Sequence, residues 1–426
     1  MNNLFESITI ESKLGSIKKF YFLDYFYIFL KSVSSYSEKE MVFDYFKNLK
    51  DMHKLSESRF KKLISADDEV SAIKLVRYKY TFNEVLEELL LYKLINVEND
   101  KITLTEKGHS ILMVYQPNNP EEFYYSIFKL MEQELHGFYQ MVKYCYQVNT
   151  NGLLIFPMYS PMKLDMRRSE IKTNGDMVAY IKKLAEKLQD DLIHFIFTPR
   201  DLTEPRKNII KRLVETELLG ENNNEAFNHQ KYNVILKRVR DFWINYFLKE
   251  IYQIPLSLSF FDIWCYRGKQ LGIINITEFY YNFDGRIVYP TSIISKKVIN
   301  SDFKNIFDYK TGECLFLHEP NQVKLQESFS RVVYDSYIDL KIHSNSYFVN
   351  IADLRDVVCY KLKISNKTFQ DLLETLYLLN IKGQTTIRIS LEADRLPEET
   401  KAMYQKRDPI MIEGTFKNII AIDLKK

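Results

Sequence analysis

The sequence predicts an α+β protein of several domains, in which a helical region that closes with short strands stands at each end of a mixed α/β centre. Three observations lead to this prediction. The chain has 426 residues, more than one domain of ordinary size contains. Near both ends, apolar residues repeat at helical spacing and are followed by alternating strands. In the centre, continuous apolar runs of strand length alternate with an amphipathic helix.

The N-terminal region is expected to begin with helices. Apolar residues at helical spacing run from Phe20 and again from Met41, and a third, shorter segment covers residues 70–77. Thr81 is followed three positions later by Glu84, which is the pattern of a capping box. This pattern predicts that a separate fourth helix starts at Thr81.

A β-hairpin is expected to follow this helix. Alternating apolar residues on either side of an Asn99-Asp100 turn predict two paired strands, and Thr105 predicts the cap of one more helix. This order of elements, carried by the stretch LLLYKLINVENDKITLTEKGHSIL, resembles the winged-helix domains of many prokaryotic proteins. The resemblance implies a module that either reads DNA or docks a protein.

The centre begins after a polar linker at residues 116–120. Apolar runs at residues 153–157 and 193–197 flank an amphipathic helix and predict a βαβ unit with parallel strands. Turn signals at residues 267–269 and 282–285 predict that the rest of the centre is rich in strands.

The C-terminal region repeats the order of helices followed by strands. Ser365 predicts the cap of its last helix. The inner stripe of that helix is expected to consist of Phe369, Leu372, Leu373 and Leu376. Two strands follow, joined by a connection over residues 393–414 that has no apolar stripe and is expected to lie outside the core. The order again resembles a winged helix, here with a long wing.

Three domains are therefore expected. They are a helical, winged-helix domain, a central mixed α/β domain and a winged-helix domain with a long wing, over residues 1–116, 121–320 and 323–426.

Composition narrows the class of protein. Lys and Arg total 59 and Asp and Glu 56, a net charge of +3 that is too balanced to indicate a nucleic-acid partner by itself. No signal-peptide pattern and no apolar run long enough to span a bilayer is visible, which predicts a cytoplasmic protein without a membrane partner. The four cysteines show no CxxC spacing and are expected to be buried, reduced thiols. They are Cys145, Cys265, Cys314 and Cys359.

Catalytic motifs are missing from the sequence. It contains no GxxxxGK[ST], GxGxxG, GxSxG or HExxH pattern, and its seven histidines are scattered. We therefore expect no catalytic residues, no metal and no cofactor. One alternative stays open, because Asp165, Glu170 and Lys172 contain the residue types with which metal-dependent nucleases hold a cation.

Basic residues of the centre are the strongest candidates for nucleic-acid binding. Nine of them lie in two clusters that each contain few acidic residues. Such clusters attract phosphates without contacting bases. They are Arg200, Arg206, Lys207, Lys211, Arg212, Lys231, Lys237, Arg238 and Arg240. A solvated face balanced by nearby glutamates is the alternative.

The helices that would read DNA in each winged helix lack the residues for it. Residues 81–95 carry Glu84, Glu87 and Glu88 against Lys93, a net charge of −2, and phosphates on both sides of a major groove would repel such a helix. We therefore expect the first module to contact a protein or a second copy. In the second module, the wing is the candidate partner-binding site, and nucleic acid is its alternative ligand. Its basic residues are Arg388, Arg395, Lys401, Lys406 and Arg407.

Aromatic residues are abundant, with 29 Phe and 30 Tyr, and most of them fall on expected core stripes. Tyr280, Tyr281 and Phe283 are expected on a turn, where stacking on a single-stranded nucleic acid is conceivable.

Together these features predict a non-catalytic, nucleic-acid-associated adaptor or scaffold subunit of a prokaryotic multi-protein complex. The chain resembles winged-helix-containing subunits of anti-phage and anti-plasmid defence systems, which implies partner ATPase or nuclease chains. A kleisin-like subunit of an SMC-type complex and a divergent metal-dependent nuclease are the alternatives. A transcription regulator would need a basic recognition helix, which is missing.

Overall fold

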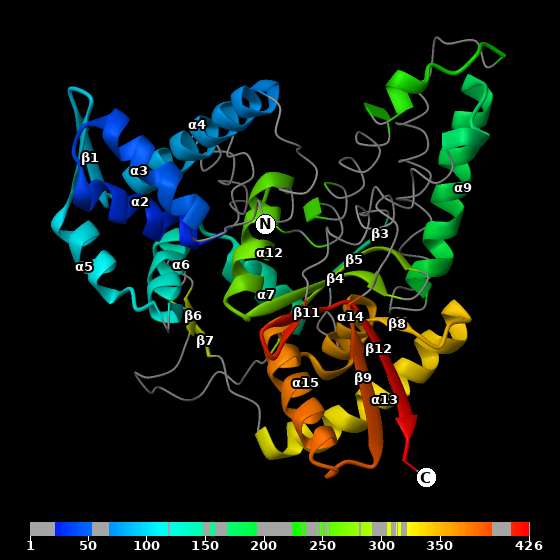
Figure 1. Cartoon of the computed structure of the whole chain (residues 1–426). Helices are drawn as coiled ribbons and strands as arrows, with labels where there is room; N and C mark the ends of the chain where they lie inside the picture. The colour runs from blue at the N-terminus through cyan, green and yellow to red at the C-terminus, as the bar shows by residue number, and fades with distance from the viewer. Residues whose placement is uncertain are drawn as a thin grey trace.

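The structure is a computed structural model that mixes helices with small sheets, as expected for an α+β protein (Figure 1). Apart from a few single positions between 233 and 312, it describes residues 22–52, 68–117, 120–147, 154–157, 168–193, 224–232, 256–280, 283–291, 305–307, 314–316, 322–393 and 410–425. The buried apolar residues of the N-terminal, central and C-terminal regions belong to one connected cluster. The three domain boundaries remain a prediction.

The N-terminal region contains the expected helices and hairpin. They are α2 (Asp24–Ser35), α3 (Lys39–Met52), α4 (Asp68–Leu91), β1 (Ile95–Glu98), β2 (Lys101–Leu104) and α5 (Glu106–Val114). Asn99 and Asp100 have φ values of 46° and 62°, the left-handed conformation that a two-residue hairpin turn requires. The Thr105 side chain caps α5 by accepting a hydrogen bond from the amide of Gly108. The hairpin and this cap are therefore confirmed.

The expected helix start at Thr81 is wrong. α4 runs without a break through 24 residues, and Thr81 lies in its interior. The segment contains neither Pro nor Gly, so it has no residue that would interrupt the helix before Thr81. Tyr78 and Phe82, on either side of Thr81, are both buried.

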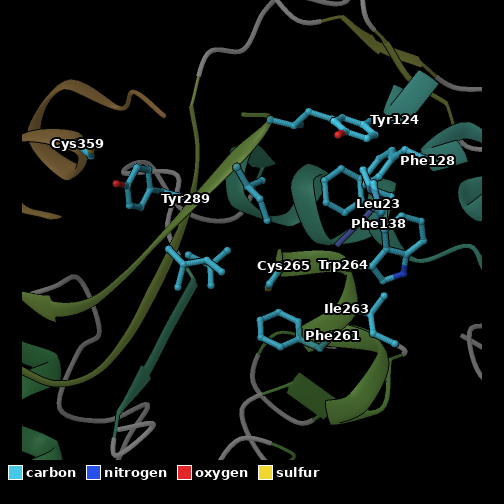
Figure 2. Packing of buried hydrophobic residues seen from close by; sticks show 14 of the residues in the cluster. Leu23, Tyr124, Phe128, Phe138, Phe261, Ile263, Trp264, Cys265, Tyr289 and Cys359 are labelled. Carbon is cyan, nitrogen blue, oxygen red and sulfur yellow. The ribbon is translucent and has the colours of Figure 1, made fainter. Parts of the chain in front are cut away.

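The central region packs around Trp264. This side chain lies 5.1 Å, between ring centroids, from both Phe128 and Phe138 (Figure 2), and its indole N–H donates to the carbonyl of His136 at 3.1 Å. The helices that meet there are α6 (Glu121–Leu135), α7 (Phe138–Gln147) and α12 (Leu258–Gln270). The turn predicted at residues 267–269 is wrong, because these residues belong to α12, which begins after its cap Ser257.

The central sheet is antiparallel in the part that the structure describes, while the parallel pairing predicted between residues 153–157 and 193–197 remains a prediction. Its order is β3-β5-β4, formed by β3 (Leu154–Pro157), β4 (Ile274–Tyr280) and β5 (Phe283–Pro290). β4 and β5 are neighbours in sequence and pair as an antiparallel hairpin, and β3 pairs antiparallel with the other edge of β5. The strand expected at residues 193–197 lies outside the described residues, except that Ile193 ends helix α9 (Asn174–Ile193).

The C-terminal region forms a second compact group of elements. It contains α13 (Gln322–Ser344), β8 (Val349–Asn350), α14 (Ile351–Leu362), α15 (Asn366–Ile381), β9 (Ile387–Glu392), β10 (Ile410–Ile412), β11 (Thr415–Lys417) and β12 (Ile419–Leu424). The strands β8, β12 and β9 form an antiparallel sheet in that order. Ser365 caps α15, and the predicted stripe of Phe369, Leu372, Leu373 and Leu376 is buried.

The expectation that the whole 393–414 connection lies outside the core is wrong at its end. Ile410 and Ile412 of β10 are buried in the core cluster, while Met411 between them is exposed. The amide of Glu413 donates to the carboxylate of Glu374 on α15 at 3.0 Å. The β10–β11 hairpin is therefore anchored to α15.

Two cysteines behave as expected, because Cys265 and Cys359 are buried free thiols. Burial raises the pKa of the Cys359 thiol well above its usual range. Figure 2 shows Tyr289 of β5 pointing toward Cys359 of α14. No described helix combines the length and the apolarity needed to cross a membrane.

Candidate functional site

Most of the predicted nucleic-acid residues of the centre cannot be placed. Arg200, Arg206, Lys207, Lys211, Arg212, Lys237, Arg238 and Arg240 all lie outside the described residues. Lys231 is described and exposed. The segment just before it is joined to the start of α9, because the amide of Phe227 donates to the carbonyl of Lys172 at 2.7 Å. The structure therefore brings two exposed lysines, Lys172 and Lys231, into the same part of the centre.

Two residues of the alternative nuclease site lie near the start of α9. Glu170 ends a short 3₁₀ turn, Arg168–Glu170, and Lys172 follows it, both exposed; Asp165 lies outside the described residues. Asp176 accepts hydrogen bonds from the amides of Lys172 and Thr173, and these bonds lower the pKa of its carboxyl group. Among the residues that the structure describes, no three His, Cys, Asp or Glu side chains are grouped to hold a metal ion.

The prediction that residues 81–95 present a net charge of −2 to a duplex is wrong. Glu84 is 8% exposed and Glu88 is fully buried, so neither faces a duplex. The exposed charges that remain are those of Glu87 and Lys93, which balance. The electrostatic argument against DNA at this helix therefore no longer holds, although a protein contact remains a prediction.

Glu88 takes part in a buried ion pair with Arg267 of α12. Arg267 donates from both terminal nitrogens to the two carboxylate oxygens, Nη1 to Oε1 and Nη2 to Oε2, the second at 2.9 Å. Their side chains are 1% and 0% exposed, and the hydroxyl of Tyr92 donates to the same carboxylate. The guanidinium also lies 5.1 Å from the ring centroid of Phe26 on α2. This cluster joins the N-terminal region to the centre.

The protonation states in this cluster follow from its geometry. Burial alone lowers the pKa of Arg267, but the charge and hydrogen bonds of Glu88 outweigh burial and raise it. Burial, and after it the neighbouring Glu88 carboxylate, raises the pKa of Tyr92 well above its usual range. Arg267 is therefore charged and the phenol of Tyr92 neutral, and the hydrogen bonds to Glu88 form a structural link between α4 and α12.

The amino end of α15 is held against the centre. The side-chain amide of Asn275 on β4 donates to the carbonyl of Ile364 at 2.9 Å and to the side-chain oxygen of Asn366 at 3.0 Å. Lys367 pairs with Glu121 of α6 at 2.9 Å. In helix-turn-helix proteins the amino end of the second helix contacts base edges. In this structure that end already contacts β4 and α6.

Arg388 is the one predicted wing residue that the structure describes. It is exposed on β9 and lies opposite Asp423 of β12. The hydroxyl of Tyr347 donates to Asp423, and the ring of Tyr347 lies 4.7 Å from the ammonium of Lys341. Arg395, Lys401, Lys406 and Arg407 lie outside the described residues.

The aromatic turn predicted in the centre is only partly described. Tyr280 pairs with Phe283 where β4 meets β5, and Tyr281 lies outside the described residues. Stacking of a base at this turn remains a prediction.

Sequence reasoning missed two features. The Glu88–Arg267 pair joins residues 179 positions apart, and its one sequence signal is that Glu88 falls among the apolar residues Val85 and Leu89 of α4 and Tyr92 just after it. The cluster of Lys341, Tyr347 and Arg388 combines residues from α13, from the loop before β8 and from β9. No pattern among neighbouring residues in the sequence indicates that these side chains meet.

Comparison of the chain with protein-family models, curated proteins and solved structures found no match.

Proposed function

We propose that the chain is a non-catalytic, nucleic-acid-associated adaptor of a prokaryotic multi-protein complex, with a winged-helix module at each end. One observation carries this proposal: the C-terminal elements follow the order α13, β8, α14, α15, β9, β12, and their sheet has the order β8-β12-β9. With the β10–β11 hairpin inserted between β9 and β12, this order supports the proposal of a winged-helix module. The sequence of α2, α3, α4, the β1–β2 hairpin and α5 supports a related module at the N-terminal end.

An adaptor role is favoured over operator reading by the contacts of α15. A helix whose amino end is bound to β4 and α6 is not free to enter a major groove without undocking. The partners in this proposal are separate chains that carry ATPase or nuclease chemistry, and a defence system is the setting that the sequence resemblance suggests. The three-stranded sheet in the centre counts against the kleisin-like alternative, whose middle part would be helical.

The nucleic-acid part of the proposal is tested by removing central charges. Replacing Arg206, Lys207, Arg212, Arg238 and Arg240 together by Ala is expected to weaken DNA binding for all sequences alike. Removing one cation that neutralises a phosphate should reduce the slope of log affinity against log salt by about 0.9 for duplex DNA. Titrations at several salt concentrations measure this slope.

The control is a variant in which exposed lysines elsewhere, Lys31 and Lys101, become Ala. Binding that survives the central substitutions with an unchanged salt slope would show that the centre does not bind phosphates.

We also expect the purified chain to lack hydrolytic activity toward DNA. The sequence contains no phosphate-binding loop, and Glu170 and Lys172 lie on an exposed turn. Incubation with plasmid and linear DNA in Mg²⁺ or Mn²⁺ provides the measurement. Cleavage that disappears in both Glu170→Ala and Lys172→Ala would support the nuclease alternative instead.

A further inference from the structure

β12 runs away from α12 and β4 toward the end marked C (Figure 1). Cationic and aromatic side chains of the C-terminal region lie beside its second half. We call this group the end surface, and its residues are Lys341, Tyr347, Phe348, Arg388 and Lys425. Arg388 lies opposite Asp423 in the β9–β12 ladder, and the amide of Lys425 continues that ladder by donating to the carbonyl of Thr386 at 2.9 Å. Lys425 stands two positions beyond Asp423, so both belong to the same face of the strand.

The end surface carries an excess of positive charge. Its named residues carry three cations, Lys341, Arg388 and Lys425, and the carboxylate of Asp423 lies opposite Arg388. The hydroxyl of Tyr347 already donates to this carboxylate. That hydrogen bond raises the pKa of Tyr347 to about 12, so its phenol stays neutral at physiological pH. The chemistry that complements this surface is a chain of negative charges.

Two aromatic rings lie beside these cations and are unusually open for their size. Tyr347 is 41% exposed and Phe348 47% exposed, and their ring centroids are 5.3 Å apart in an edge-to-face arrangement. The ammonium of Lys341 lies over the Tyr347 ring. Phe348 is therefore the ring better placed to receive a flat ligand. Cations that follow a phosphate chain and an aromatic ring that stacks a base are the combination found in single-strand binding.

The end surface is also reachable while the module is docked. The amino end of α15 contacts β4 and α6, whereas Arg388, Phe348 and Lys425 are exposed. A ligand at the end surface does not have to displace these docking contacts.

We propose that the end surface binds the backbone of a single-stranded nucleic acid through Lys341, Arg388 and Lys425, with one base stacked on Phe348. The proposal rests on the nucleic-acid association proposed above, but it places a contact on the C-terminal module instead of the centre. It also assigns Arg388 to nucleic acid and not to a protein partner. An acidic peptide has the same charge but gains less from an exposed aromatic ring, and it becomes an outcome of the test.

The test compares charge-reversed variants of the full chain with a labelled 20-nucleotide oligo-dT and a 20-base-pair duplex. Lys341→Glu/Arg388→Glu is expected to weaken oligo-dT binding at least tenfold and to reduce its salt slope by about 0.7 for each cation removed. Arg331→Glu, an exposed charge reversal on α13 of the same module, is the matched control and should bind like the wild type. Thermal unfolding verifies that all variants are folded.

Three further variants test the stacking contact of Phe348 and the carboxylate of Asp423. Phe348→Ala is expected to weaken oligo-dT binding about five- to a hundredfold with little change in salt slope, and Phe348→Trp should retain it. Asp423→Asn should strengthen oligo-dT binding, because it removes the negative charge of the carboxylate that lies opposite Arg388.

Three results would overturn the inference. If the end-surface variants bind oligo-dT like the wild type while the central variant does not, the inference is wrong and the proposed function stands. If a poly-glutamate peptide binds in a way that depends on Arg388 while oligo-dT does not, the ligand is an acidic protein segment. If the wild type binds neither oligo-dT nor duplex, the inference and the nucleic-acid part of the proposed function fall together.

Discussion

Replacing Glu88 by Leu is expected to lower the free energy of unfolding by about 3–5 kcal/mol, because the buried guanidinium of Arg267 loses its carboxylate. Arg267→Met should cost a similar amount by leaving the carboxylate of Glu88 uncompensated. Denaturant unfolding followed by circular dichroism measures both. Arg267→Lys should also destabilise, since an ammonium cannot donate to both carboxylate oxygens in the planar geometry of Arg267.

The double variant Glu88→Leu/Arg267→Met separates the two contributions. With both charges removed, no buried charge is left unpaired, although the buried hydroxyl of Tyr92 loses its acceptor. The double variant should therefore be more stable than either single variant and return close to the wild type. Glu87→Gln is the control, because Glu87 is the exposed neighbour on the same helix and its change should stay within about 0.5 kcal/mol. A Glu88→Leu variant no less stable than Glu87→Gln would show that the pair does not hold α4 to α12.

The end of the long connection is expected to belong to the core of the C-terminal module. Ile412→Ala should lower the free energy of unfolding by about 2–5 kcal/mol, as removal of a fully buried branched side chain does. Met411→Ala is a matched control on the same strand, because that side chain is 42% exposed. Its effect should stay within about 0.5 kcal/mol.

Leu373→Ala, in the buried stripe of α15, provides a reference for a core position in the same module, with the same expected range. If Ile412→Ala and Met411→Ala have equal, small effects, the β10–β11 hairpin does not contribute to the core. In that case the whole connection would act as a segment outside the core.

The elements that sequence reasoning places correctly are those set by short-range interactions. The Asn99-Asp100 turn and the caps at Thr105 and Ser365 each depend on residues at most three positions away. The buried stripe of α15 is also predicted correctly, because helical periodicity is itself a local property.

The errors of sequence reasoning have one physical cause. The pattern of Thr81 and Glu84 fits both a helix that starts at Thr81 and a helix that continues through it. The residues near Thr81 alone do not distinguish these two cases, and in the structure the helix continues through Thr81. The exposed charge of α4 is misjudged for the same reason, since the partner of Glu88 is provided by a helix far along the chain.

By itself, therefore, the sequence determined the N-terminal hairpin, the caps at Thr105 and Ser365, the buried stripe of α15 and the absence of known catalytic motifs, all of which depend on neighbouring residues. Tertiary structure decided the continuity of α4, the antiparallel pairing of β3 with β5 and the burial of Glu88 against Arg267. It also decided that Lys341, Tyr347 and Arg388 meet at one surface. The reason is that a buried charge, a strand partner or a composite surface depends on which distant segments pack together, and hydrophobic burial, which drives that packing, has no preferred direction along the chain.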